Sequence, residues 1–288
     1  MIYFCADDYG LNNESSQRIL QCTDEGVINK VSVFPNFYTA DIKDFEEKEN
    51  IRLSLHLNLV EGKCMGDARE IDLIADKEGN FKYTFGGLFK LWLFQGKRFE
   101  AQLYKEIRAQ VLFWKSCIPQ NTPFCIDSHQ HTHMIPAVFR ALMKVLDDEK
   151  IKAEYIRIPA EPILPYIKIP SLYLSYSPVN IIKQWLLKAL WMFNKKLLKK
   201  QNIPTAYFCG ILFSGKMDEK RVRKVLTEYI KLAEKNSKDI EVLFHPGYIN
   251  EDEKDFADKN IVFEKFYLSK NRKTEYDSVM KITERRVP

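Results

Sequence analysis

Short apolar segments alternate with longer amphipathic segments along most of this chain. The short segments are rich in Val, Ile, Leu, Phe and Tyr, and most are apolar at successive positions, as strands covered on both faces must be. The longer segments place apolar residues at helical spacing. This alternation predicts right-handed βαβ units and a parallel sheet. The expected strands are Tyr3–Asp8, Lys30–Asn36, Arg52–Leu59, Pro123–His131, Ala153–Pro159, Thr205–Leu212 and Ile240–His245.

The number of strands favours a curled sheet over a flat one. Seven parallel strands with helical connections predict the α/β class and a TIM-barrel-like (β/α) barrel of seven strands. No linker, internal repeat or low-complexity tract interrupts the 288 residues, so we predict a single domain over residues 1–288. The expected helices are Glu14–Glu25, Ala40–Glu49, Phe99–Lys115, Ala137–Asp148, Pro178–Lys200, Glu219–Asn236 and Thr274–Thr283.

Two segments look like additions to this barrel. Phe85–Gln95 is aromatic and contains glycines that could act as hinges, and Ile181–Lys200 is apolar at first and ends in four lysines. We expect both helical insertions to cap the mouth of the barrel.

The composition argues against a nucleic-acid-binding protein and against a membrane-spanning protein. The formal net charge is only +5, and no concentrated basic stripe of the kind that binds nucleic acid is present. No uncharged apolar run reaches the ~18 residues of a membrane span. The chain leads directly into its first expected strand without a signal peptide, and none of its six cysteines forms a CxxC pair. We therefore expect a cytoplasmic protein whose thiols are small buried hydrophobes.

The five histidines are the most specific feature of the composition. All of them lie in three short polar motifs at the ends of expected strands, and none lies in the long Lys- and Glu-rich helices. In a parallel barrel these strand ends open on one face, where active sites are built. The histidines are His56, then His129, His131 and His133, and finally His245.

The central motif runs from Asp127 to His133. If the strand continues through it, Asp127, His129 and His131 share one side, and His133 joins them if the strand extends that far. The alternative is an exposed polar strand end whose groups hydrogen-bond with water. A metal site is favoured, because imidazole is the most common neutral metal ligand.

Asp7 and Asp8 end the first expected strand. Adjacent carboxylates repel each other, and two separate roles suit them: one binds a metal and the other accepts a proton. The alternative is capping of the next helix, but Asn12 and Asn13 already provide N-cap candidates.

Three further residues have a functional and a structural interpretation. His56 alternates with apolar neighbours, as a core histidine would, but its position at a strand end favours a site. His245 precedes a turn-forming Pro-Gly pair that would hold it rigidly. Arg157 could orient a catalytic carboxylate or bind substrate. An ion pair between Arg157 and Glu161 is an equally good explanation.

Taken together, these motifs resemble the YdjC-like carbohydrate deacetylases, the family that includes the chitooligosaccharide deacetylases. They follow one another in the family's order and extend from residue 6 to residue 247. The residues that carry the resemblance are Ala6-Asp7-Asp8-Tyr9-Gly10, Leu55-His56-Leu57-Asn58-Leu59, Asp127-Ser128-His129-Gln130-His131-Thr132-His133, Arg157-Ile158-Pro159 and Glu241-Val242-Leu243-Phe244-His245-Pro246-Gly247.

The resemblance implies a TIM-barrel-like fold and hydrolysis of an N-acetyl group on an amino sugar. It also implies one divalent metal ion bound by Asp8, His56 and His129, with Asp7 as general base and His245 as general acid. The metal is Mg²⁺ or Zn²⁺; two nitrogen ligands suit zinc better. The expected substrate is an oligosaccharide or glycoconjugate that contains N-acetylglucosamine. Residues expected to contact substrate or orient the ligands are Asp127, His131, His133 and Arg157.

Two departures from the family bear on these expectations. Ser54 stands where members often have glycine, and we expect little effect on the metal. The Pro162–Lys200 region is longer and more apolar than is typical of the family, which leaves the substrate open.

Two other classes of protein compete with a deacetylase. A metal-dependent phosphoesterase or amidohydrolase barrel usually carries a His-x-His pair on its first strand, whereas this first strand ends in Asp-Asp. A membrane-surface or partner-binding module is suggested by Ile181–Lys200, where Trp185, Trp191 and Phe193 are followed by lysines. A helix packed on the barrel with solvated lysines is the favoured explanation of that segment. The sequence also leaves open whether the protein is a homodimer.

Overall fold

A computed structural model describes residues 1–37, 40–256, 261 and 263–282. Seven strands form one sheet in the order β5-β4-β3-β2-β1-β7-β6, and every neighbouring pair is parallel. The strands are β1 (Ile2–Tyr9), β2 (Lys30–Val33), β3 (Arg52–Leu57), β4 (Cys125–Ser128), β5 (Tyr155–Ile156), β6 (Tyr207–Cys209) and β7 (Ile240–Phe244).

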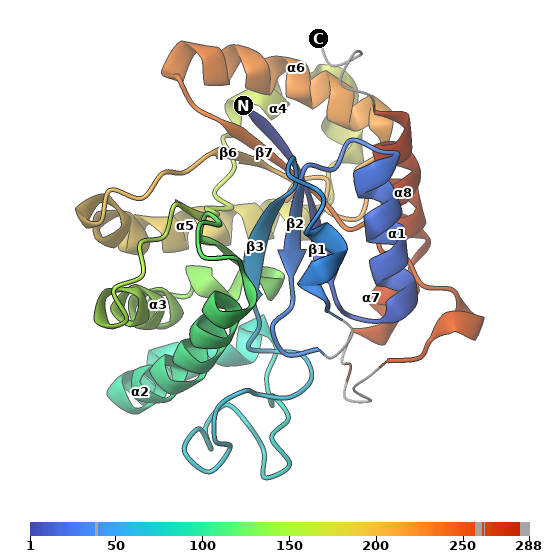
Figure 1. The fold of residues 1–288 in the computed structure, drawn as a ribbon. Helices are drawn as coiled ribbons and strands as arrows, with labels where there is room; N and C mark the ends of the chain where they lie inside the picture. The colour runs from blue at the N-terminus through green and yellow to red at the C-terminus, as the bar shows by residue number, and fades with distance from the viewer. Residues whose placement is uncertain (38–39, 257–260, 262, 283–288) are drawn as a thin grey trace.

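This order follows the chain around a cylinder, because β7 lies beside β1. The sheet curls into a barrel-like shape that is open on one side, since the described residues form no strand ladder between β5 and β6. The seven-stranded, barrel-like α/β fold expected from the sequence is therefore confirmed. Helices surround the strands in Figure 1. They are α1 (Asn13–Asp24), α2 (Phe85–Cys117), α3 (Pro136–Asp148), α4 (Leu164–Ile167), α5 (Pro178–Lys200), α6 (Glu219–Asn236), α7 (Glu264–Tyr267) and α8 (Lys270–Lys281).

The helices with a clear apolar stripe were predicted well. Helices α5 and α6 have the expected bounds, and α1 begins one residue early, capped by the Asn12 side chain, which accepts a hydrogen bond from the Ser15 N–H at 2.8 Å. The helix expected at Ala40–Glu49 is wrong. Only a 3₁₀ helix, η1 (Ile42–Phe45), forms there, because its single buried side chain, Phe45, provides no apolar stripe. Thr283, the last residue of the final expected helix, lies outside the described residues.

Helix α2 is longer than the expected Phe99–Lys115 and includes Phe85–Gln95 as its first part. Gly96 separates the two parts, with φ of 46° in the left-handed region that glycine adopts at little cost. The segment expected as an insertion is therefore the beginning of a helix that changes direction at Gly96. Figure 1 shows α2 and α5 on the same side of the barrel.

The barrel interior contains charged side chains where an apolar core would be expected. Lys30 on β2 lies 3.1 Å from Glu241 on β7, and the Arg157 Nε donates to the same Glu241 oxygen at 2.7 Å. Tyr155 on β5 donates to the other Glu241 oxygen. All four side chains are fully or almost fully buried. Buried polar groups therefore connect strands on different sides of the barrel.

A carboxylate bridges the open side between β5 and β6. Glu161 follows β5 and accepts hydrogen bonds from the backbone N–H groups of Gly210, Ile211 and Leu212, which follow β6. The Tyr166 hydroxyl also donates to Glu161, at 2.9 Å. Side-chain hydrogen bonds thus replace the missing strand ladder.

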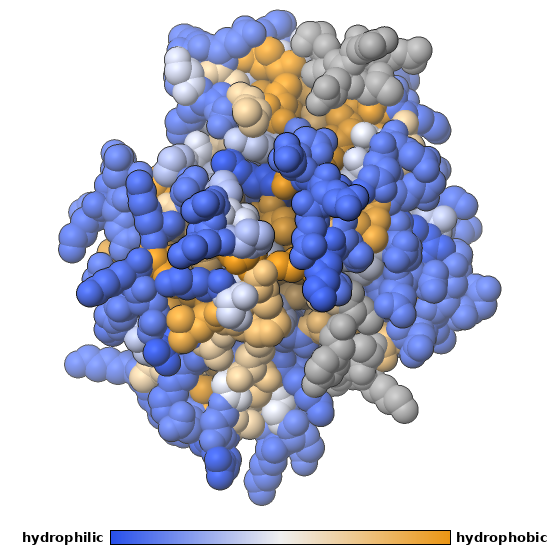
Figure 2. Space-filling model, in the orientation of Figure 1, coloured by the Kyte–Doolittle hydropathy of each residue, from blue (hydrophilic) through white to orange (hydrophobic). Residues whose placement is uncertain are grey.

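The outer surface is mostly polar in the view of Figure 2, with apolar residues visible chiefly near the middle. Within the described part of the chain, no helix has both the length and the apolar content that crossing a bilayer requires. All six cysteines are free thiols, and four of them are buried, as expected for small hydrophobes.

Replacement of Glu161 by alanine should destabilise the fold. Three buried N–H groups would lose their acceptor, and each unsatisfied group costs about 1–3 kcal/mol. We expect Glu161→Ala to lower the free energy of unfolding by about 3 kcal/mol or more in urea titrations, and Glu161→Gln to lower it less. Glu234→Ala, on the exposed face of α6, is the control. Equal stability of Glu161→Ala and the unmodified protein would contradict the bridging role.

Candidate active site

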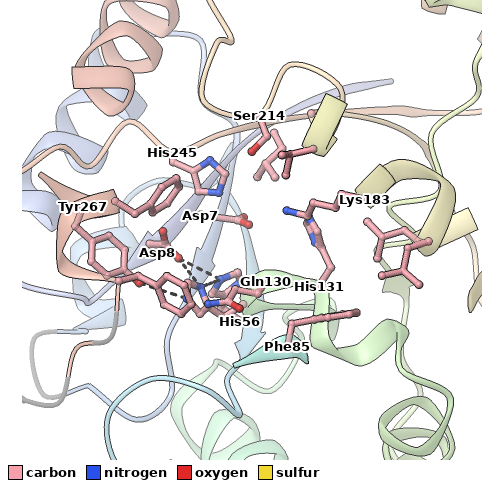
Figure 3. Close-up of a pocket in the computed structure, with 18 of the residues that line it drawn as sticks. Asp7, Asp8, His56, Phe85, Gln130, His131, Lys183, Ser214, His245 and Tyr267 are labelled. Atoms are coloured by element: carbon pink, nitrogen blue, oxygen red, sulfur yellow. Dashed lines mark hydrogen bonds and ion pairs between the residues drawn. The ribbon is translucent and has the colours of Figure 1, made fainter. Parts of the chain in front are cut away.

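The strands end in a pocket at the mouth of the barrel, with a volume of about 480 Å³. Figure 3 shows polar side chains around this pocket, with His245 and Asp8 on one side and His131 and Lys183 on the opposite side. Both segments expected to cap the mouth contribute to it. Its lining includes Asp7, Asp8, His56, Phe85, His129, Gln130, His131, Val179, Ile182, Lys183, Leu186, Leu187, Ser214, His245, Phe266 and Tyr267.

Asp8, His56 and His129 converge at the base of this pocket, and we call them the triad. One Asp8 oxygen lies 3.0 Å from the His129 Nδ1 and 3.3 Å from the His56 Nε2. The two imidazole nitrogens are 3.4 Å apart. The three residues are distant in sequence, at the end of β1, in β3 and directly after β4. The structure therefore brings together the three residues that the sequence nominated as metal ligands.

A sharp turn of the backbone aims the central histidines. Strand β4 ends at Ser128, and the chain continues as a 3₁₀ helix, η2 (His129–Met134), in which Gln130 and His131 have φ of 53° and 58°. The strand expected to continue to His131 is therefore wrong beyond Ser128. Strand alternation does not place these side chains on one face; the turn does. Positive φ at non-glycine residues is unfavourable and occurs often at functional sites.

Each member of the triad is held by a second contact on its outer atom. The Asp127 carboxylate binds the His56 Nδ1 at 2.6 Å, which turns the His56 Nε2 toward Asp8. The Tyr267 hydroxyl lies 3.3 Å from the His129 Nε2. Arg272 donates to the second Asp8 oxygen. Outer contacts of this kind fix ring orientation and tautomer in metal sites.

The charges around the triad favour a cation. Burial alone would lower the pKa of His56, but Asp7, Asp127 and Asp8 outweigh it and raise this pKa to about 10. Burial lowers the pKa of His129, against the opposing effect of Asp8, so that this imidazole is neutral and has a free lone pair. The site therefore stabilises added positive charge at the point where the ligand atoms meet.

The donor set fits a divalent transition ion. Two imidazole nitrogens and one carboxylate oxygen lie within 4.8 Å of one another, which suits zinc, and oxygen ligands from substrate or water could complete a magnesium site. Four buried carboxylates face three permanent cations in this network, so it has one negative charge in excess when both imidazoles are neutral, the form in which imidazole binds a metal. They are Asp7, Asp8, Asp127 and Glu241, against Lys30, Arg157 and Arg272.

Two other clusters of potential ligands lie among the described residues, one of which shares His56 with the triad, but both are less suitable. Cys5, Asp127 and Glu241 lie together, as do Asp7, His56 and Asp127. Their carboxylates already bind Arg157 or His56, and neither Asp127 nor Glu241 lines the pocket. Of these three groups, only the triad has all of its residues in the pocket lining.

Arg157 forms a bidentate ion pair with Asp7. Its Nη1 and Nη2 atoms donate to the two Asp7 oxygens at 2.7 and 2.9 Å. Burial alone would raise the pKa of Asp7, but the Arg157 charge, aided by His56, holds it below its ordinary value. Arg157 therefore orients Asp7 as an ionised carboxylate. It does not pair with Glu161, the alternative that the sequence left open, because Glu161 binds backbone N–H groups.

His245 lies at the pocket directly after β7, and its ring points toward the same space as Asp7 (Figure 3). Its backbone N–H donates to Glu275 on α8 at 2.6 Å, and its Nδ1 lies 3.3 Å from the same oxygen. The carboxylate fixes the ring and leaves the Nε2 free. His245 is 17% exposed and so can exchange protons with solvent.

The two remaining histidines have different positions. His131 lines the pocket, and its buried Nδ1 has no hydrogen-bond partner among the described residues. His133 lies outside the pocket lining, where its Nδ1 contacts the Ser128 hydroxyl at 2.5 Å and its Nε2 contacts the Arg157 carbonyl at 2.7 Å. Burial lowers the pKa of His133 to about 4 and that of His131 well below its ordinary value. His131 is thus placed to touch a ligand, whereas His133 supports the backbone of Arg157.

Four residues at or near the site were not predicted from the sequence. Lys183 lines the pocket from α5, and Tyr267 lines it from α7. Arg272 and Glu275 on α8 contact Asp8 and His245 from behind the pocket lining. The C-terminal three lie in a highly charged segment where site residues and surface residues look alike. Lys183 gave a weak signal, since it interrupts an otherwise apolar run of residues.

Comparison with known proteins identifies a family that matches this chain. Residues 1–285 match the family described as YdjC-like protein. A protein from Danio rerio named carbohydrate deacetylase is 31% identical over 167 residues, which cover 57% of this chain and 52% of that protein. A Clostridium beijerinckii protein of the same name is 24% identical over 188 residues, which cover 63% and 71%. The match thus spans about half the length of the vertebrate relative.

A solved structure shares the fold. A crystal structure of an Enterococcus faecalis V583 protein, described as a proposed cellobiose-phosphate cleavage protein, superimposes with a TM-score of 0.64. The alignment covers 97% of this chain and 90% of that chain at 14% identity, so it supports the architecture alone.

Substitution of Asp127 should weaken cation binding without removing a ligand. Asp127→Asn loses the negative charge that orients the His56 ring, and changes to outer contacts cost about 10–100-fold in metal affinity. We expect that loss in calorimetric titrations with Zn²⁺. Ser128→Ala, which removes the contact with His133 only, should bind Zn²⁺ as the unmodified protein does. An unchanged affinity in a folded Asp127→Asn protein would refute the orienting role.

Proposed function

Because this chain belongs to the YdjC-like protein family, we propose that it is a metal-dependent hydrolase that removes an N-acetyl group from an amino sugar. The proposed substrate is an oligosaccharide or glycoconjugate that contains N-acetylglucosamine. We also propose that residues 1–288 form one domain, since the site draws on residues from β1 to α8.

One observation carries the proposal: a potential ligand triad, an ionised carboxylate and a solvent-accessible histidine all face one pocket. Amide hydrolysis needs an activated water, stabilisation of an oxyanion and a proton for the leaving nitrogen. The chain supplies a separate group for each need. The names of the curated relatives support the same reaction.

Asp8, His56 and His129 would hold the cation. A divalent ion bound there would lower the pKa of water to ~7 in a favourable site and polarise the acetyl carbonyl. Arg272, Asp127 and Tyr267 keep the three ligands in position. The donor set admits either Zn²⁺ or Mg²⁺.

Asp7 is proposed as the general base. Arg157 binds both of its oxygens, so the carboxylate is ionised and fixed in direction. Asp7 then accepts a proton from the water that attacks the acetyl carbon. The adjacent Asp8 faces the triad, so the two neighbouring carboxylates have separate roles. General base catalysis of this kind contributes ~10²–10⁴-fold to a rate.

His245 is proposed as the general acid. Its Nδ1 faces the Glu275 carboxylate, which orients the ring. The free Nε2 can give a proton to the sugar nitrogen as the carbon–nitrogen bond breaks. The products are acetate and the free amine. His131 and Gln130 line the same pocket and would contact the sugar.

Acetate release is the direct test of this proposal. We expect release from N-acetylglucosamine oligomers, its loss after treatment with a chelator, and its recovery on addition of Zn²⁺ or Mg²⁺. The measurement is an enzyme-coupled acetate assay over a panel of chain lengths. Phosphodiester cleavage without any acetate release would favour the phosphoesterase alternative instead.

Asp7→Asn separates the base from the metal ligands. The variant keeps the triad, so we expect it to bind one divalent ion per chain and to lose at least about a hundredfold in acetate release. Elemental analysis and the acetate assay measure the two effects. Asp8→Asn is the comparison, since it should lose metal and activity together. A fully active Asp7→Asn protein would refute the base assignment.

A further inference from the structure

Helix α5 exposes large apolar side chains on its outward side, where an ordinary surface helix is polar. Its outward side presents Val179, Ile182, Trp185, Met192 and Phe193, which are 57–71% exposed. Steps of three residues from Val179 to Trp185 and of seven residues from Trp185 to Met192 are close to whole turns of a helix, so these side chains lie along one side of it. The charged residues Lys196, Lys199 and Lys200 follow at the end of the same side.

The inward side of α5 is anchored by amides as well as by leucines. The Gln184 side chain donates to the Glu161 carbonyl at 3.0 Å, and the Asn194 side chain donates to the Met134 carbonyl at 2.9 Å. These hydrogen bonds fix which face points outward. Helix α6 provides the contrast, because its most exposed residues are all polar. They are Lys220, Lys231, Glu234, Lys235 and Asn236.

The exposed apolar surface continues onto α2. Trp92 and Phe193 are in edge-to-face contact, with ring centroids 6.0 Å apart. Beside Trp92, Leu93 and Phe94 are 55% and 79% exposed. We call the outward stripe of α5 together with Leu93 and Phe94 the α5 face. Of the fifteen large apolar residues most exposed in the described chain, ten lie between Leu164 and Phe193, so the exposure is concentrated in this region.

The charge of this region is unbalanced in one direction. Residues 162–217 contain eight lysines and neither an acidic residue nor an arginine, and residues 79–99 contain four basic and no acidic residues. Because the whole chain carries only +5, the remainder is net negative. Apolar side chains flanked by lysines are complementary to an anionic bilayer, where rings enter the interface and ammonium groups bind lipid phosphates. A second copy of this chain would instead bring like charges together.

We propose that the α5 face docks on the surface of an anionic lipid bilayer. Val179 and Ile182 belong both to the face and to the lining of the central pocket. Docking therefore holds the pocket mouth at the membrane surface, within reach of sugars attached to lipids. The Lys188 ammonium lies 5.8 Å from the centre of the Trp185 ring, an arrangement that suits the boundary between acyl chains and headgroups.

Co-sedimentation with vesicles tests this docking and requires no enzymatic activity. The full chain should sediment with vesicles of mixed phosphatidylglycerol and phosphatidylcholine, much less with phosphatidylcholine alone, and less as salt increases. The triple variant Trp185→Ser, Met192→Ser, Phe193→Ser should lose about tenfold or more in vesicle affinity. None of its three residues lines the pocket. Phe113→Ser, an exposed ring outside the α5 face, is its control.

A second pair of variants tests the charges. Lys196→Gln, Lys199→Gln, Lys200→Gln should lower affinity for anionic vesicles about tenfold or more. Lys220→Gln, Lys231→Gln, Lys235→Gln removes the same charge from α6 and should bind nearly as the unmodified protein does. Circular dichroism and thermal unfolding establish that each variant is folded.

Three results would overturn the proposal. The unmodified chain could remain in solution with anionic vesicles, or the two triple variants of α5 could bind as well as their controls. Light scattering could also reveal a dimer that the serine variant dissociates, which would mean that a second copy covers the face. Because acetate release is not the readout, failure here leaves the proposed deacetylase reaction to its own tests.

Discussion

The guanidinium of Arg157 is the interaction on which the site depends. It lies in the barrel interior, fully buried, and contacts carboxylates from three strands: Asp7 of β1, Asp127 of β4 and Glu241 of β7. Each contact has a consequence at the pocket. Asp7 stays ionised and lines the pocket, and Asp127 keeps one oxygen for His56. Loss of this one cation would remove the partner that binds both oxygens of the buried Asp7, whereas Asp127 and Glu241 would keep Lys30. A buried charge without its partner is among the most unfavourable features that a protein interior can have.

A polar barrel interior has a cost in stability. Replacement of buried ion pairs by well-packed apolar residues is often neutral or stabilising, so the Lys30–Glu241–Arg157 network does not explain why the fold is stable. Stability comes from the apolar layer between strands and helices. The network gives orientation: His133 and Glu241 hold Arg157, Arg157 holds Asp7 and Asp127, and Asp127 holds His56. Function therefore accounts for charges that the fold alone does not need.

The sequence predicted those parts of the site that depend on local sequence patterns. Apolar strands and histidines at strand ends are local patterns, so the seven strands and the positions of Asp8, His56 and His129 could be read directly. The turn after Ser128 could not, because Gln130 and His131 adopt a positive φ that their residue types do not announce. Three site residues near the C-terminus could not be predicted either, because the sequence around them resembles that of a surface helix. Arg272 and Tyr267 contact Asp8 and His129, which are more than a hundred residues away in sequence, and Glu275 contacts His245. Lys30 and Glu241 are recognisable in the sequence, because each is a charged residue inside an otherwise apolar strand.

The apolar outward side of α5 also follows from the barrel's open side. Glu161 uses its carboxylate to bridge β5 and β6, and its backbone carbonyl is left to accept the Gln184 amide from α5. An inward amide at that position fixes the rotation of the helix, and Asn194 repeats the constraint nearly three turns later. With the rotation fixed from inside, Leu187 and Leu190 pack into the core on the same side as the two amides, and Trp185, Met192 and Phe193 on the opposite side face outward. The exposed α5 face is thus a consequence of how the barrel is closed, and the same closure brings Lys183 and Ile182 to the pocket wall.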